Sequence, residues 1–197
     1  MTNHRLHLSR PAVITATVAT VAGLASGVVT YLNRSPQLEP QIPGTEAWLP
    51  HLVVLAVVTV WYVVAARRSP LGWKVVFTPL GRPIAARIGA TFRSGLGVVG
   101  VLRGLAVAFL VLLEVYMAWR IGKQVFAGLD PNFPRNAWGG PSYLGAMFCH
   151  YLDGALLYPI CHVLLRKVTV PARPAAAAPD RMTGQGPRIR ERALLGG

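Results

Sequence analysis

Four apolar stretches, each long enough to cross a lipid bilayer, constrain this chain more than any other feature of its sequence. They lie at about residues 11–32, 49–66, 97–119 and 142–165. A bilayer core needs about 20 apolar residues per helical span. Backbone groups in lipid must also find hydrogen bonds within the spanning segment, which favours helices. The sequence therefore predicts an all-α membrane protein, with a four-transmembrane-helix bundle at residues 11–167.

Charged residues are scarce, yet the balance among them is strongly basic. They make up 14% of the 197 residues, and the formal net charge is +13; an average soluble domain has about 25% charged residues. A nucleic-acid-binding protein gathers its basic residues on one face of a folded domain, whereas here they flank the apolar stretches. We therefore expect membrane lipids as partners and no nucleic acid. Each Lys or Arg near an anionic membrane surface contributes about 1 kcal/mol.

The basic residues fall mostly on one side of the predicted membrane. That side collects the N-terminus (1–10), the loop 67–96 and the tail, while the other side has only Arg34, Arg120, Lys123 and Arg135. The positive-inside rule then predicts a multi-pass protein of the cell (plasma) membrane with both termini cytoplasmic. The loop supplies the predicted contacts with lipid head groups, which are Arg67, Arg68, Lys74, Arg82, Arg87 and Arg93.

Two segments outside the spans have weaker patterns. Glycines and prolines interrupt the first half of the loop 67–96. Its second half spaces Ile84, Ile88 and Phe92 four residues apart, which fits a short helix on the head groups and a plain loop equally well. The segment 168–197 is rich in Pro, Ala and Arg and has few large apolar residues. It is predicted to be a disordered C-terminal tail.

Small residues repeat along the first span, where Gly23 and Gly27 extend a row begun by Ala16 and Ala19. In lipid, such a row lets a second helix backbone approach closely. Gly23 and Gly27 are therefore the predicted helix-packing positions, although the abundance of Gly and Ala explains the row equally well. A partner on this face would be another membrane subunit or a second copy of the chain.

Ionisable residues at membrane depth are costly and usually functional. Glu114 lies in the third span, His150 and Asp153 lie one turn apart in the fourth, and His51 is near the start of the second. The third span runs outward and the fourth inward, so we expect these four side chains to form one cluster open to the outer side. Arg103, near the inner boundary, can extend its charge to the cytoplasmic surface.

Several functions fit this cluster. Imidazole and carboxylate groups bind divalent metals, relay protons or bind a cationic substrate. The same groups also join helices through hydrogen bonds, at about 1 kcal/mol per contact. No motif of a known enzyme chemistry is present, so the sequence favours a non-enzymatic protein with no cofactor. We expect a small transport, binding or accessory subunit. The alternatives are a structural scaffold and a membrane redox or metal/haem-binding protein that uses His51, His150 and His162.

The fourth span has two further features. Pro159 removes a backbone hydrogen bond to the Ala155 carbonyl, which favours a cavity beside Asp153. Cys149 and Cys161 lie twelve residues apart, or about 18 Å along a helix. A disulfide needs Cα atoms within about 7 Å, so we expect two buried free thiols.

Overall fold

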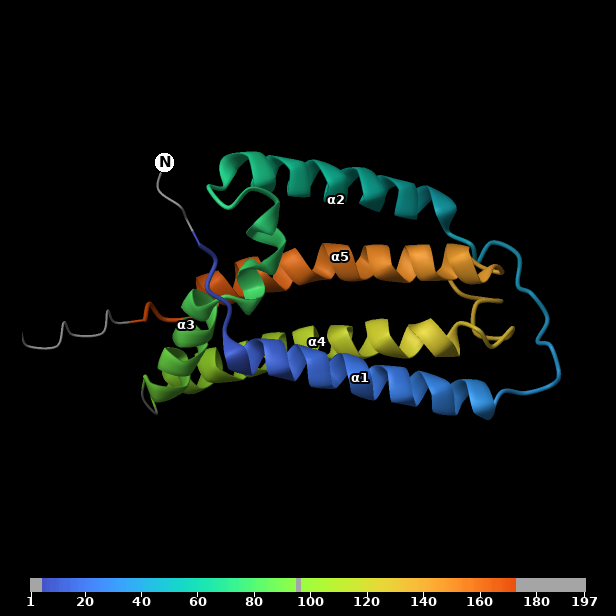
Figure 1. Cartoon of the computed structure of the whole chain (residues 1–197), viewed down its shortest axis with the longest axis horizontal. Helices are drawn as coiled ribbons and strands as arrows, with labels where there is room; N and C mark the ends of the chain where they lie inside the picture. Colours follow the sequence, from blue (N-terminus) through green and yellow to red (C-terminus); the bar gives the residue numbers. More distant parts are fainter. Residues whose placement is uncertain (1–4, 95–96, 173–197) are drawn as a thin grey trace, which may run out of the picture.

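The structure is a computed structural model that describes residues 5–94 and 97–172. Its four long helices are α1 (Arg10–Leu32), α2 (Trp48–Arg68), α4 (Val98–Ala127) and α5 (Tyr143–Val168) (Figure 1). The 3₁₀ helix η1 (Gly72–Leu80) and the short helix α3 (Arg82–Arg93) connect α2 to α4. Each long helix is long and apolar enough to cross a membrane. The predicted all-α fold with four candidate spans is confirmed.

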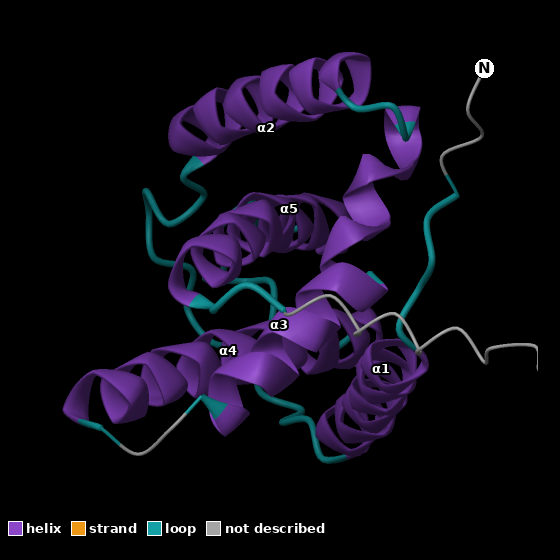
Figure 2. Cartoon of the chain, turned by 90° about the vertical axis from the view of Figure 1, so that its left-hand side faces the viewer, coloured by secondary structure: helices purple, strands orange, loops and turns teal. Residues whose placement is uncertain are grey.

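The long helices lie side by side in the order α2, α5, α4, α1 (Figures 1 and 2). Each one packs against its neighbour in this row. α5, near the middle, is the least apolar of the four and the most buried. Large apolar side chains such as Val18, Val60 and Phe109 are exposed on the other three helices, as expected where a helix surface faces lipid.

The ends of α1 and α5 follow from local sequence. Pro11 lies in the first turn of α1, where a missing backbone N–H costs nothing. At the other end, the Asn33 side chain donates to the Val29 carbonyl over 2.8 Å. Ser142 precedes α5, and its hydroxyl oxygen accepts a hydrogen bond from the Gly145 amide over 3.1 Å. This is the usual role of a serine before a helix.

The contact between α1 and α4 depends on glycine. A Cβ atom at Gly23 would overlap the Trp119 carbonyl oxygen, and one at Gly27 would overlap the Lys123 carbonyl oxygen. On the opposing helix, a Cβ atom at Gly122 would overlap the Thr20 carbonyl oxygen. The two backbones therefore touch directly. The Gly23 and Gly27 face packs against α4 of the same chain. It is therefore not available to another membrane subunit or a second copy of the chain.

α4 continues beyond Trp119, where its apolar stretch was predicted to end, through Arg120 and Lys123 to Ala127. The Lys123 ammonium lies 5.2 Å from the centroid of the Trp119 ring, an attractive geometry for a cation and an aromatic face. Charged residues ended the apolar pattern there, but they did not end the helix. Glu114 consequently lies near the middle of α4, whereas a span that ended at Trp119 would place it close to the outer end.

The loop end is the end of the molecule that holds the connections 33–47 and 128–142 (right in Figure 1). Two asparagine side chains join these connections. The Asn132 side chain accepts from the Glu39 amide over 2.9 Å and donates to the Gln37 carbonyl over 2.8 Å. Asn136 makes the same pair of hydrogen bonds with the next part of that segment. The first connection is thus held against the second.

The opposite, terminal end holds the start of α1 and the end of α5 (Figure 2). Here α3 is a helix packed against α4 and α5, and its Ile84 is buried in a core that includes Val107 and Leu165. The second half of the predicted loop 67–96 is therefore helical. The residues just before α1 also join this end, because Leu8 forms an antiparallel bridge with Gly81.

Arg87 differs from the other five predicted lipid contacts. Its guanidinium donates to the Arg166 carbonyl over 2.6 Å and to the Thr169 carbonyl over 2.9 Å, which satisfies carbonyl groups that a helix end leaves free. Thr169 and Val170, assigned from sequence to the disordered tail, contact α3 through these and further hydrogen bonds. The rest of that tail, 173–197, lies outside the described residues. The other five residues predicted to contact lipid head groups are exposed: Arg67, Arg68, Lys74, Arg82 and Arg93.

Candidate functional site

His51 and Asp153 meet between α2 and α5 at the loop end. The His51 Nδ1 atom lies 2.8 Å from the Ala47 carbonyl. A carbonyl only accepts, so Nδ1 carries a hydrogen. The other ring nitrogen, Nε2, lies 3.5 Å from Asp153 Oδ1. Two bare acceptors would repel each other at this distance, so a further proton on one of them stabilises the contact. The pair therefore forms a site for one exchangeable proton.

His150 lies beside this pair and has a different partner. The Arg120 Nη2 atom lies 3.1 Å from His150 Nδ1. A guanidinium has no acceptor, so Nδ1 must accept and His150 is neutral with its hydrogen on Nε2. Arg120, His51 and Asp153 all lie within electrostatic range of His150. We call His51, Arg120, His150 and Asp153 the loop-end cluster.

Aromatic residues of the connection 128–142 cover the loop-end cluster. The Trp138 ring centroid lies 5.3 Å from that of His51, and the Phe133 ring centroid lies 6.3 Å from that of His150. His51 is 4% exposed, whereas the Asp153 side chain is 22% exposed. The carboxylate is thus the more accessible partner of the pair.

Glu114 is not part of the loop-end cluster, although the sequence grouped it with His51, His150 and Asp153. It lies within electrostatic range of Tyr158 and Cys161, further along α5. Its Oε1 atom is buried and has no hydrogen-bond partner among the described residues. The structure therefore brings three of the four predicted residues together and places the fourth at the middle of α4.

An apolar layer lies at Gly154, one residue after Asp153. An added Cβ atom at Gly154 would lie 3.4 Å from Met117 Cε and 3.8 Å from Ile121 Cδ1. Both side chains come from α4, on the same side of that helix as Glu114. Met117, which is buried, lies between Glu114 and Arg120 along α4.

A small cavity of about 80 Å³ lies beyond Glu114, between α2, η1 and α5. Tyr62, Tyr158, Pro159 and His162 are among the residues that line it. The sequence predicted a cavity near Pro159, but beside Asp153; the structure places it one to two turns further along α5. The Nδ1 atom of His162 is buried and has no partner within the described part of the chain.

Two residues of these sites were missed in the sequence. Arg120 was assigned to a loop because it follows the apolar stretch, although Ile121 and Val125 continue a helical apolar spacing after it. Tyr158 was not singled out in the sequence. It lies eight residues after His150 and four before His162, so these three positions follow one another along α5 at helical spacing.

The geometry of the histidines bears on the metal and haem alternatives. His51 and His150 each have one ring nitrogen engaged by a protein group, and His162 lies toward the other end of α5. Within residues 5–94 and 97–172, no three or more His, Cys, Asp or Glu side chains are grouped to hold a metal ion.

Comparison with protein-family models, curated proteins and solved structures gives no match.

Proposed function

We propose that this chain is a small transport protein that moves protons through the polar side chains between α2, α4 and α5. One observation carries the proposal: the carboxyl group of Glu114, at the middle of a membrane helix, has a buried oxygen with no partner among the described residues. A side chain that served only to join helices would have a hydrogen-bond partner there. An ionisable group without one, at this depth, is typical of a pathway for ions or protons.

The remaining polar groups supply steps on either side of Glu114. At the loop end, the His51 and Asp153 pair takes up one proton at a carboxylate that is partly exposed. In the middle, Glu114 accepts the proton within electrostatic range of Tyr158. From there His162, which lines both the small cavity and a larger one at the terminal end, passes it on. Carboxyl and imidazole groups can each both accept and release a proton.

Met117 supplies the control point of this path. Its side chain lies against Gly154, between the loop-end cluster and Glu114. Methionine is unbranched and flexible, so a change of its rotamer opens or closes contact between the two groups. The path is therefore gated rather than continuously open.

We also propose that the terminal end faces the cytoplasm of a cell membrane. The exposed basic side chains of the α2–α4 connection, including Arg68, Lys74 and Arg82, all lie at that end. At the loop end, Arg120 is engaged with His150, and Lys123 lies over the Trp119 ring. The excess of free positive charge at the terminal end supports a cytoplasmic location for both termini.

Proton flux into liposomes tests the function. Purified protein is reconstituted with a pH-sensitive dye inside the vesicles, and a potassium gradient with valinomycin supplies the driving force. We expect wild-type flux above that of protein-free vesicles, and Glu114→Gln and Asp153→Asn to lower it at least about tenfold, as loss of a proton-transfer group usually does. Glu39→Gln, at an exposed acid of the loop end, is the matched control and should retain the flux. Equal flux in wild type and Glu114→Gln, or none in wild type, would contradict the proposal.

A further inference from the structure

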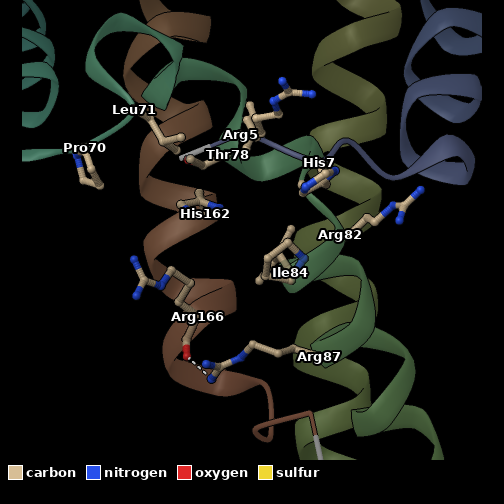
Figure 3. Close-up of a pocket in the computed structure, with 13 residues that line it drawn as sticks. Arg5, His7, Pro70, Leu71, Thr78, Arg82, Ile84, Arg87, His162 and Arg166 are labelled. Carbon is tan, nitrogen blue, oxygen red and sulfur yellow. Dashed lines mark hydrogen bonds between the residues drawn. The ribbon is translucent and has the colours of Figure 1, made fainter. Parts of the chain in front are cut away.

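A second cavity, of about 610 Å³, lies at the terminal end between the N-terminal segment, η1, α3 and α5 (Figure 3). Nearly half of the residues that line it are basic, and none of the described lining residues is acidic. The basic residues are Arg5, His7, Arg82, Arg87, His162 and Arg166. Such a set of donors fits an anionic group, because arginine binds phosphate and carboxylate oxygens through paired hydrogen bonds.

The basic residues have distinct places in this cavity. His7 and His162 point toward its interior, and the longer Arg5, Arg82 and Arg166 lie around its edge (Figure 3). His162 brings a buried Nδ1 atom that has no partner within the described residues. The three arginine side chains are exposed, so each can turn its guanidinium toward a ligand at little cost.

Arg87 prepares the cavity in another way. The last carbonyl groups of α5 carry the negative end of the helix dipole, and they would repel an anion. The Arg87 guanidinium donates hydrogen bonds to the carbonyl oxygens of Arg166 and Thr169. Because that negative end is already neutralised, the charges of Arg82 and Arg166 remain available for a ligand.

The cavity also has an apolar wall, formed by Leu6, Leu71 and Ile84. It adjoins the small apolar cavity between α2, η1 and α5, since Thr78 and His162 line both. A charged group at the arginines could therefore be joined to an apolar chain that follows this wall. A free inorganic anion would use the arginines but leave the wall empty.

We propose that this cavity binds an anionic amphiphile through its phosphate or carboxylate group, with the apolar chain along Leu71 and Ile84. A membrane phospholipid with a net negative head group is the ligand of this class that a membrane protein meets at highest concentration. The site shares His162 with the proposed proton path, but lipid binding and proton flux are measured separately, so either proposal can fail while the other stands. It differs from general attraction to the membrane surface, since it needs arginines that line one cavity.

The test is lipid binding to the full-length protein in a non-ionic detergent, measured by native mass spectrometry with added phosphatidylglycerol or phosphatidylcholine. The detergent removes the surface charge of a bilayer. We expect preferential binding of phosphatidylglycerol. Arg166→Gln and Arg82→Gln should each weaken it about tenfold, the loss expected for one charge-assisted contact. Arg68→Gln, at an exposed arginine of the same end that does not line the cavity, is the matched control and should leave binding unchanged.

Two further measurements test whether the lipid binds in this cavity and whether its apolar chain is needed. Leu71→Trp fills the apolar side of the cavity without changing charge, and it should weaken phosphatidylglycerol binding as strongly as Arg166→Gln does. Titration calorimetry with inorganic phosphate should show no binding at the concentrations at which the lipid binds. Protection of the buried thiols of Cys149 and Cys161 confirms that each variant is folded. Equal losses in Arg68→Gln and Arg166→Gln, full binding by Leu71→Trp, or phosphate binding as tight as that of the lipid would each overturn the proposal.

Discussion

Replacing Gly122 with alanine should loosen the contact between α1 and α4. The added Cβ atom would overlap the Thr20 carbonyl oxygen and would lie 3.0 Å from the Leu24 amide nitrogen. Carbon prefers neighbours at about 3.5–4.0 Å. Backbone atoms have no rotamer into which they can retreat, so the helices themselves must move apart by about 0.5–1 Å. A gap of that size forfeits about a quarter to a half of the dispersion energy of each contact along the seam.

The magnitude follows from two opposing terms. Alanine favours a helix over glycine by about 1 kcal/mol, while an extra methyl group in a packed site usually costs about 1–3 kcal/mol. At Gly122 the second term is at its upper end, so we expect a net loss of about 1–2 kcal/mol in the free energy of unfolding. Gly104 is the matched control on the same helix, because its nearest neighbour would be a Phe92 ring carbon at 3.9 Å. Gly104→Ala should leave stability unchanged or raise it by up to about 1 kcal/mol.

The chain provides its own reporter for this measurement. Its two cysteines, Cys149 and Cys161, are 0% and 2% exposed, so a thiol-reactive dye labels them only on unfolding. Thermal scans in detergent should place Gly122→Ala below Gly104→Ala by about 2–12 °C, because the two variants should differ by about 1–3 kcal/mol at about 2–4 °C per kcal/mol. Circular dichroism followed in parallel detects any loss of helix that does not coincide with dye labelling. Equal midpoints for the two variants would refute the direct backbone contact.

Three further predictions concern the two ends of the molecule. Asn132→Ala removes two hydrogen bonds to the first connection, so it should lower stability by about 1–2 kcal/mol and speed hydrogen exchange at the Glu39 amide; unchanged exchange would contradict the contact. Arg87→Lys keeps the charge but loses the fork that binds the end of α5, so it should destabilise the protein by about 1–2 kcal/mol, while Arg93→Lys should not. Nitrogen-15 NMR should show neutral His150 with its hydrogen on Nε2, and a hydrogen on Nδ1 would exclude the assigned contact with Arg120.

The four spans were predictable because the bilayer imposes length and apolar composition on each segment separately. The starts of α1 and α5 fell within one residue of their predicted positions, since proline and serine mark these boundaries. The end of α4 was not predictable in the same way. Apolar composition indicates where the lipid core ends, whereas a helix ends where its backbone N–H and C=O groups find hydrogen-bond partners outside the helix. In α4 the two limits differ: the apolar stretch ends at about Trp119, but the helix continues to Ala127.

That one boundary accounts for the error in the predicted site. With α4 ending at Trp119, Glu114 would lie near the loop end and at the depth of His150. With the helix extended, the loop-end position passes to Arg120, which binds His150, and Glu114 moves toward Tyr158. The pairing of His51 with Asp153 depended instead on which helices are neighbours. No local pattern in the sequence states that α2 packs against α5, so this contact required the tertiary structure.

The arrangement of α4 separates stability from the proposed chemistry. At about 100° per residue, Glu114, Met117 and Ile121 share one face, which turns to α5, while Gly122 lies on another face, which turns to α1. α1 contributes no ionisable side chain along its described helix after Arg10 except Tyr31, so its contact with α4 is architectural. α5, in contrast, is the least apolar span, and it can remain in a membrane only because α2 and α4 cover its polar side chains. A substitution at Gly122 should therefore change the stability of the bundle without altering which groups line the path, and one at Glu114 should do the reverse.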